Sequence, residues 1–215
     1  MPRDATETRS RLLREAERLF ARHGVYQATL REITEAADQR NVSALNYHFG
    51  SREGIVRAIL ERHGDPLDAE RGRRLVEPVD EMPTPALVAA LLVPLADQLG
   101  HPAGRDYLRI VAQLSHRFPA WRVDDPLSTP HLRRVLAVLE SRAGGPDPAV
   151  RRERVVDVIM MMMTAMAERA RVVDRGRSPE LDRDVFVANL TDMIVGALEA
   201  PSQLDRAGLA HARGG

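Results

Sequence analysis

The chain has 215 residues, of which 44% are hydrophobic, 29% charged and only 4% aromatic, and its 31 basic residues balance 31 acidic ones. This composition excludes an intrinsically disordered chain, and a core of Leu, Val, Ile, Ala and Met favours helices over sheets, so we expect an all-α protein. The absence of cysteine excludes disulfides, thiolate metal sites and a cysteine nucleophile.

The N-terminus and the hydropathy pattern predict a cytoplasmic protein. Asp4 comes early and no apolar segment follows it, unlike in a signal peptide. No stretch approaches the roughly 18 consecutive apolar residues of a membrane span.

Helix signals divide the first 63 residues into four short helices. Apolar residues at three-and-four spacing predict a helix over about 8–23, closed by Gly24. Thr29, with Glu32 three residues later, predicts a capped second helix ending near Ala37. A turn over residues 38–40 leads to further helices capped by Asn41 and by Ser51, the third ending at Phe49.

Pro and Gly residues divide the rest of the chain into about five further helical segments, so we expect about nine helices in total. We expect helices over 84–99 with a kink at Pro94, 104–117, 130–144, 148–175 and, capped by Ser178, up to Ala200. A loop lies over 78–85 and an irregular connection over 118–129. These signals predict a small N-terminal domain at 1–63, a larger helical domain at 64–200 and a flexible tail at 201–215.

The stretch from Thr29 to Leu60 has the arrangement of a helix-turn-helix: a short supporting helix, a tight turn and a short helix with small or polar residues outward. Residues 1–63 hold 11 Arg against 9 Asp and Glu, an excess of two. This excess is far below a strongly basic footprint, so the DNA hypothesis rests on the motif.

From its first helix to Leu45-Asn46-Tyr47-His48-Phe49 and Gly50-Ser51-Arg52-Glu53, the sequence resembles the tetracycline-repressor (TetR) family of transcriptional regulators. The resemblance covers roughly residues 8–62. It departs from the family pattern in one additional residue between Ile33 and Phe49 and in the replacement of the usual glycine of the turn within 38–40.

The resemblance implies an N-terminal three-helix DNA-binding domain joined to an effector-binding and dimerisation domain. Tyr47, His48, Thr29 and the Ser51-Arg52 helix start would contact phosphates, Arg31 would read guanine, and Asn46 would contact adenine or a phosphate. The predicted DNA-binding residues are Thr29, Arg31, Gln39, Arg40, Asn41, Val42, Ser43, Ala44, Asn46, Tyr47, His48, Ser51 and Arg52. Equally, Tyr47 and His48 could cap a small core with Phe49, and Arg31 and Arg52 could lie on a solvated face.

The last two predicted helices carry broad apolar stripes, which suit a two-fold four-helix interface. The predicted dimer residues are Val155, Ile159, Met162, Met166, Phe186, Leu190, Met193, Ile194 and Ala197. The few large aromatics and polar groups of this half, with the methionine run at 160–163, suggest an effector pocket. The candidate pocket residues are Tyr107, Arg109, Gln113, His116, Phe118, Trp121, Met160 and Met163, although core or interface packing is the favoured explanation for the methionines.

These patterns predict a DNA-binding transcriptional regulator: a homodimeric repressor on a palindromic operator, released by a small-molecule effector, with no metal or other cofactor. The sequence holds no hydrolase, phosphate-loop or zinc-protease motif, which argues against an enzyme. The alternative is a helical dimeric adaptor without DNA binding, which leaves the Thr29–Arg52 pattern unexplained.

Overall fold

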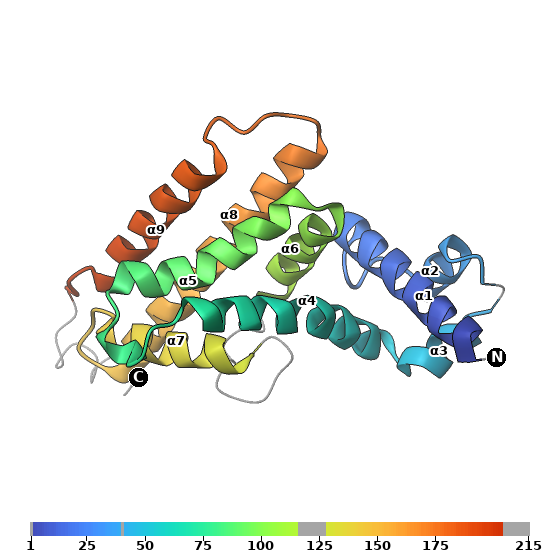
Figure 1. Ribbon diagram of the computed structural model, residues 1–215, viewed down its shortest axis with the longest axis horizontal. Coiled ribbons are helices and arrows are strands. Elements are labelled where there is room, and N and C mark those ends of the chain that lie inside the picture. The colour runs from blue at the N-terminus through green and yellow to red at the C-terminus, as the bar shows by residue number, and fades with distance from the viewer. Residues whose placement is uncertain (1, 40, 116–127, 204–215) are drawn as a thin grey trace, which may run out of the picture.

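The computed structural model describes residues 2–39, 41–115 and 128–203, and within them the chain forms nine α-helices and no strand. A small helical domain lies at one end of an elongated molecule and a larger helical bundle at the other (Figure 1). The predicted all-α class and the helix count are confirmed.

The small domain consists of α1 (Pro2–His23), α2 (Leu30–Ala36) and α3 (Ser43–Phe49). Its core is built from Leu12, Phe20, Ile33 and Leu45, none more than 1% exposed. The predicted capping box is present: the Thr29 side chain accepts from the Glu32 amide, and the Glu32 carboxylate accepts from the Thr29 amide at 2.7 Å. The first helix begins at Pro2 rather than at the predicted Thr8.

Helix α4 (Arg52–Arg74) belongs to both parts of the molecule. Its first half contributes Ile55 and Ile59 to the core shared with α1, and its second half contributes Leu67 and Arg71 to the larger bundle. The helix therefore runs continuously through Pro66 and past the boundary that the sequence suggested at residue 63.

The larger bundle contains η1 (Val79–Glu81), α5 (Thr84–Asp97), η2 (Gln98–Gly100), α6 (Pro102–Leu114), α7 (Pro130–Arg142), α8 (Pro148–Asp174) and α9 (Arg183–Glu199). Helix α6 packs on α8, and α5 packs on α9. Asp147 caps α8 as predicted, with its carboxylate accepting from the Ala149 amide at 2.7 Å. The cap predicted for α9 was wrong: Asp182, not Ser178, accepts from the Val185 amide at 2.9 Å.

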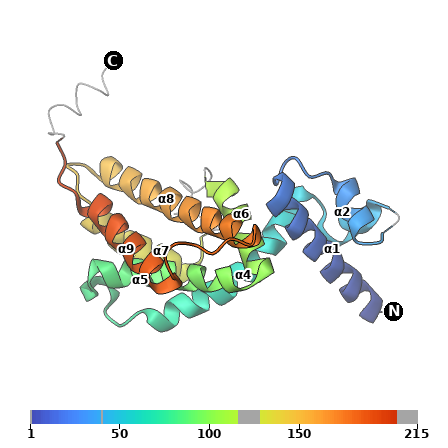
Figure 2. The same ribbon diagram turned by 90° about the horizontal axis from the view of Figure 1, so that it is seen from above.

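Helix α6 also joins the two parts, because it packs against α1 (Figure 2). The Gln113 side chain accepts a hydrogen bond from the Val25 amide at 2.9 Å and donates to the Phe20 carbonyl at 3.2 Å. One side chain of the larger bundle thus holds the end of α1 and the loop that follows it.

Replacing Gln113 with leucine is expected to lower the free energy of unfolding by about 1–3 kcal/mol, since it leaves the buried Val25 amide without its acceptor. Urea unfolding followed by circular dichroism measures the change. A midpoint equal to that of the unmodified protein would show that the contact contributes nothing to holding the two parts together.

Candidate nucleic-acid interface

Helix α3 turns one face inward and the other outward. Leu45 is 1% exposed and joins the core, whereas Tyr47 is 83% exposed. Ser43 and Asn46 are exposed beside it, at the three-and-four spacing of one helical face. The outward face, Ser43-Asn46-Tyr47, carries hydroxyl and amide groups that can donate to and accept from DNA.

The turn between α2 and α3 contains one residue in the left-handed backbone region. Asp38 has a φ of 54°, a conformation that aspartate tolerates better than most residues. After the turn, Asn41 accepts from the Ser43 amide at 2.9 Å and so orders the start of α3. The intervening Arg40, predicted to contact DNA, lies outside the described residues.

Arg31 on α2 is exposed, and its Nε donates to Glu35 at 2.7 Å. This hydrogen bond raises the pKa of Arg31. Because both side chains lie in solvent, a guanine or a phosphate can replace Glu35 at little cost. The Thr29 hydroxyl, in contrast, is held by Glu32 at 2.7 Å.

Arg52 is half-buried and points into its own domain. Its Nη1 donates to the carbonyls of Val25 at 2.5 Å and Ala28 at 2.7 Å, and its guanidinium lies 5.6 Å from the centre of the Phe20 ring. In this structure Arg52 therefore fixes the loop between α1 and α2 and does not present its charge to a phosphate.

The other predicted DNA-binding residues surround α3. Ser51 is exposed and caps α4 through the Gly54 amide at 3.2 Å. His48 is half-buried, with its ring 5.0 Å from that of Tyr47. Val42 and Ala44 are half-buried at the start of α3, and Gln39 is half-buried in the turn. Phe49 packs partly buried against the core, under the Arg9 guanidinium.

Gly54 fixes how closely α4 approaches α3. A Cβ atom at this position would lie 1.9 Å from the Phe49 carbonyl oxygen, which is backbone and cannot move aside alone. The turn between the two helices therefore depends on the absence of a side chain here.

Replacing Gly54 with alanine is expected to destabilise the protein by about 1–3 kcal/mol, because the clash outweighs the gain in helix propensity. Chemical denaturation measures the loss. Gly100→Ala is the matched control, since nothing lies within 4 Å of a Cβ at that position. Equal stability of the two variants would contradict the close approach.

Most of the predicted dimer residues lie inside the subunit. The residues at most 4% exposed are Val155, Ile159, Met162, Met166, Leu190 and Ile194. They pack in the core of the subunit. Met193 is 52% exposed, Ala197 is exposed and Phe186 is half-buried, so these three remain at the surface of α9.

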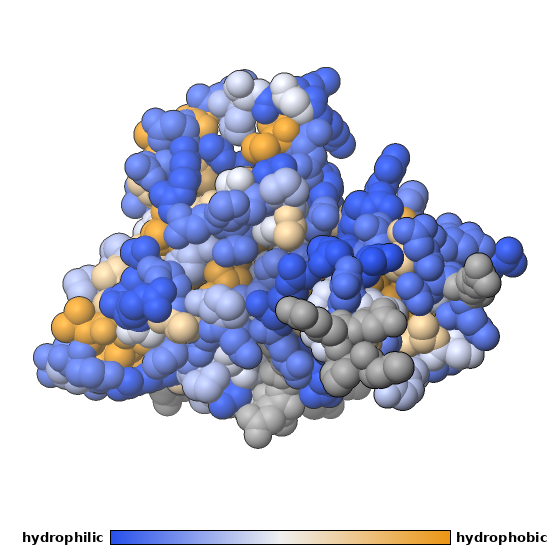
Figure 3. Space-filling model, turned by 45° about the vertical axis from the view of Figure 1, so that its right-hand side comes forward, coloured by the Kyte–Doolittle hydropathy of each residue, from blue (hydrophilic) through white to orange (hydrophobic). Residues whose placement is uncertain are grey.

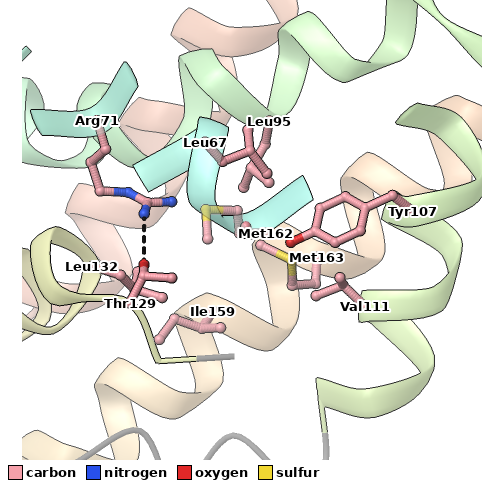
Figure 4. Close-up of a pocket in the computed structure, with 11 residues that line it drawn as sticks. Leu67, Arg71, Leu95, Tyr107, Val111, Thr129, Leu132, Ile159, Met162 and Met163 are labelled. Atoms are coloured by element: carbon pink, nitrogen blue, oxygen red, sulfur yellow. Dashed lines mark hydrogen bonds between the residues drawn. The ribbon is translucent and has the colours of Figure 1, made fainter. Parts of the chain in front are cut away.

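Of the predicted pocket residues that the structure describes, Tyr107 and Met163 line a cavity in the larger bundle (Figure 4). Arg109 instead forms salt bridges with Asp106 and Asp174, and Met160 is 39% exposed on α8. Gln113 is the contact to the small domain described above. His116, Phe118 and Trp121 lie outside the described residues.

The sequence reasoning missed two polar residues of this cavity, Arg71 and Thr129. Their signal in the sequence is weak: Asp68 and Arg71 stand three apart in a charged stretch of α4, a spacing typical of a solvated ion pair. Thr129 precedes Pro130 as an ordinary helix start.

Neither a metal-binding cluster nor a membrane-spanning helix is present in the described parts of the chain. No group of three or more His, Asp or Glu side chains there is placed to hold a metal ion. None of the described helices combines the length and the apolarity needed to cross a bilayer.

The solved structures that are similar to this fold include the following two. NalD, the secondary repressor of the MexAB-OprM multidrug efflux pump in Pseudomonas aeruginosa, is 20% identical with a TM-score of 0.56, over 91% of this chain and 98% of NalD. A bacterial regulatory protein in the tetR family from Rhodococcus RHA1 is 12% identical with a TM-score of 0.52, over 91% of this chain and 98% of that one. No curated protein matches the chain.

The sequence model of the bacterial regulatory proteins of the tetR family matches residues 12–59, which run from the core of α1 to the first half of α4. The matched region therefore contains the whole of α2 and α3, including the outward face of α3. Residues 12–59 thus match the tetR family of bacterial regulatory proteins, and the chain carries the DNA-binding part of a transcriptional regulator of that kind.

Proposed function

We propose that the protein is a homodimeric repressor that acts in the cytoplasm, by binding and not by catalysis, on a palindromic operator, and that a small molecule releases it. The observation that carries the proposal is the outward face of α3, where Asn46 is exposed and Tyr47 is 83% exposed. In a helix-turn-helix such a face enters the major groove, where asparagine pairs with adenine through two hydrogen bonds. Arg31 on α2 would add a contact at the groove edge.

The exposed side of α9 is the proposed dimer interface. Val185 is 49% and Met193 52% exposed, and Ala197 continues the same side of the helix. Most of the surface seen in Figure 3 is hydrophilic, with hydrophobic residues gathered in small patches. A two-fold axis at α9 would present two α3 helices to half-sites about one DNA turn apart.

A chain of contacts leads from the cavity of the larger bundle to the DNA-binding domain. The Tyr107 ring lines the cavity and stacks on His63 of α4, with 4.6 Å between the ring centres. His63 Nε2 lies 2.6 Å from a carboxylate oxygen of Glu17, which is 2% exposed on α1. A ligand that moves Tyr107 would therefore change the contact between His63 of α4 and Glu17 of α1. Effector release requires such a difference between the ligand-bound and ligand-free conformations.

Fluorescence anisotropy with DNA fragments from around the gene tests the proposal. We expect a palindromic fragment to bind far more tightly than a scrambled one, with affinity that falls steeply as salt rises. An adaptor would bind neither fragment, and equal binding to both at every salt concentration would also refute a sequence-specific repressor.

A further inference from the structure

The loop between α1 and α2, residues 24–29, is buried at two points where its backbone needs partners. Val25 and Ala28 are each 1% exposed. Water has little access to such a backbone, so protein groups must pair with its amides and carbonyls. The Ala28 amide is paired within the loop, since it donates to the Gly24 carbonyl at 3.1 Å. The Val25 amide and the carbonyls of Val25 and Ala28 are paired by side chains from other helices.

Two side chains from different helices pair with the backbone of Val25. Gln113 of α6 accepts from the Val25 amide at 2.9 Å, and Arg52 of α4 donates through Nη1 to the Val25 carbonyl at 2.5 Å. Helix α6 belongs to the larger bundle, where its Tyr107 and Val111 line the cavity. The position of the loop therefore depends on the larger bundle as well as on α4.

Arg52 extends this contact to the start of α2. The same Nη1 donates to the Ala28 carbonyl at 2.7 Å. That carbonyl shares a peptide unit with the amide of Thr29, the N-cap of α2, which donates to Glu32 at 2.7 Å. The peptide before α2 is thus bonded through both its oxygen and its nitrogen. The first turn of the supporting helix is thereby fixed relative to α4.

We propose that Arg52 and Gln113 are positioning residues for operator binding: together they hold the backbone of Val25 and so set the place of α2, and of α3 packed on it, relative to the larger bundle. This inference rests on the proposed function, because it names the residues that order the surface that meets the operator. In this arrangement neither side chain contacts the DNA, whereas the family resemblance implies a phosphate contact for Arg52.

The loss of either contact lowers operator affinity by changing how often the surface is ordered. A buried carbonyl or amide that loses its partner is destabilised, so the loop moves to pair with water. Helix α2 moves with it, because Ala28 and Thr29 share a peptide unit. Operator affinity falls in proportion to the fraction of molecules whose surface is ordered, so a fall of that fraction to about one-tenth weakens binding about 10-fold.

Fluorescence anisotropy with the palindromic operator fragment over a range of salt concentrations tests the proposal. Arg52→Met keeps an unbranched side chain and removes its N–H donors, and is expected to weaken operator binding about 10-fold. Removing a side chain that neutralises one phosphate lowers the steepness of log affinity against log salt by about 0.9. We expect Arg52→Met to leave this steepness unchanged, and a fall of about 0.9 would overturn the proposal in favour of a phosphate contact.

Arg57→Met is the matched control, because Arg57 is an exposed arginine of the same helix. It removes the same charge and is expected to leave operator affinity within about twofold of the starting value. An equal loss of affinity in the two variants would assign the effect to charge and overturn the proposal. Thermal unfolding of each variant sets the temperature at which all are folded. Unchanged operator affinity in folded Arg52→Met would leave that residue a role in stability alone and overturn the proposal as well.

Gln113→Leu removes the contact from α6 without changing any charge. It is expected to weaken operator binding about 3- to 10-fold at unchanged salt steepness, since one neutral hydrogen bond is worth less than those of a charged donor. Unchanged operator affinity in the folded variant would show that α6 does not act on the DNA-binding surface through the loop.

Hydrogen exchange followed by mass spectrometry measures the loop without DNA. Arg52→Met and Gln113→Leu are both expected to speed the exchange of amides in residues 24–36, while those of α8 keep their rate. Unchanged exchange in both variants would refute this inference and leave the repressor intact. If the unmodified protein bound no operator, the repressor would be refuted, and the exchange rates would still decide whether the two side chains hold the loop.

Discussion

Replacing both Asn46 and Tyr47 with alanine is expected to weaken specific operator binding by at least about 100-fold, because removing one base or phosphate interaction from a half-site costs about 1–3 kcal/mol. The fold is expected to survive, since both side chains are exposed and the core residue between them and the domain, Leu45, is untouched. Substitutions at such positions change the free energy of unfolding by about 0.5 kcal/mol or less. Anisotropy titrations and thermal unfolding measure the two effects.

Tyr26→Ala is the matched control for this variant. Tyr26 is 59% exposed in the connection between α1 and α2, beside Val25, which Gln113 of α6 contacts. Its removal is expected to leave operator affinity within about twofold of the starting value. Normal operator binding by the α3 double variant would mean that another surface reads the DNA.

Placing glutamate at both Met193 and Ala197 is expected to convert the protein to a monomer and to lower operator affinity by about 100- to 10,000-fold, the gain that joining two half-site binders provides. The physical reason is that a two-fold axis brings each new charge next to its copy in an interface without water. Light scattering after gel filtration measures the mass, and anisotropy measures the operator affinity.

Val76→Glu is the control for the α9 variant, because Val76 is 68% exposed and lies far from α9 in sequence, after α4. It introduces one such negative charge and is expected to leave the dimer intact. A dimer that persists in the Met193 and Ala197 double variant would move the interface to another surface, with α8 around Met160 the next candidate.

The burial of Arg71 and Asp68 contributes little to the free energy of folding. Buried ion pairs contribute little to stability on balance, because removing two charges from water offsets their attraction. Here the pair also leaves the Arg71 Nε without a partner in the described residues, which costs further free energy.

Local signals in the sequence determined the helices that begin at strong caps. The Thr29 and Glu32 pair, Ser51 and Asp147 each cap the helix that was predicted for them. A cap is recognised from two to four neighbouring residues, so no distant contact is needed to predict it. The predicted N-cap of α9 was wrong because Ser178 and Asp182 are both good caps four residues apart, and neighbouring residues alone do not indicate which of them caps the helix.

The sequence by itself thus predicted the helix-turn-helix and most of the helices, since these depend on caps and on a periodicity within short segments. It left open whether Tyr47 faces outward or covers a small core, and the structure shows Tyr47 exposed. Only the tertiary structure decided which neighbour covers each apolar stripe: α8 and the inner side of α9 bury theirs within the subunit, and Met193 stays outside. It alone also brought Arg71, Tyr107 and Thr129 to one cavity. The reason is that periodicity shows that a face is apolar but not what packs on it, and charges far apart in the sequence meet only when the helices that carry them pack together.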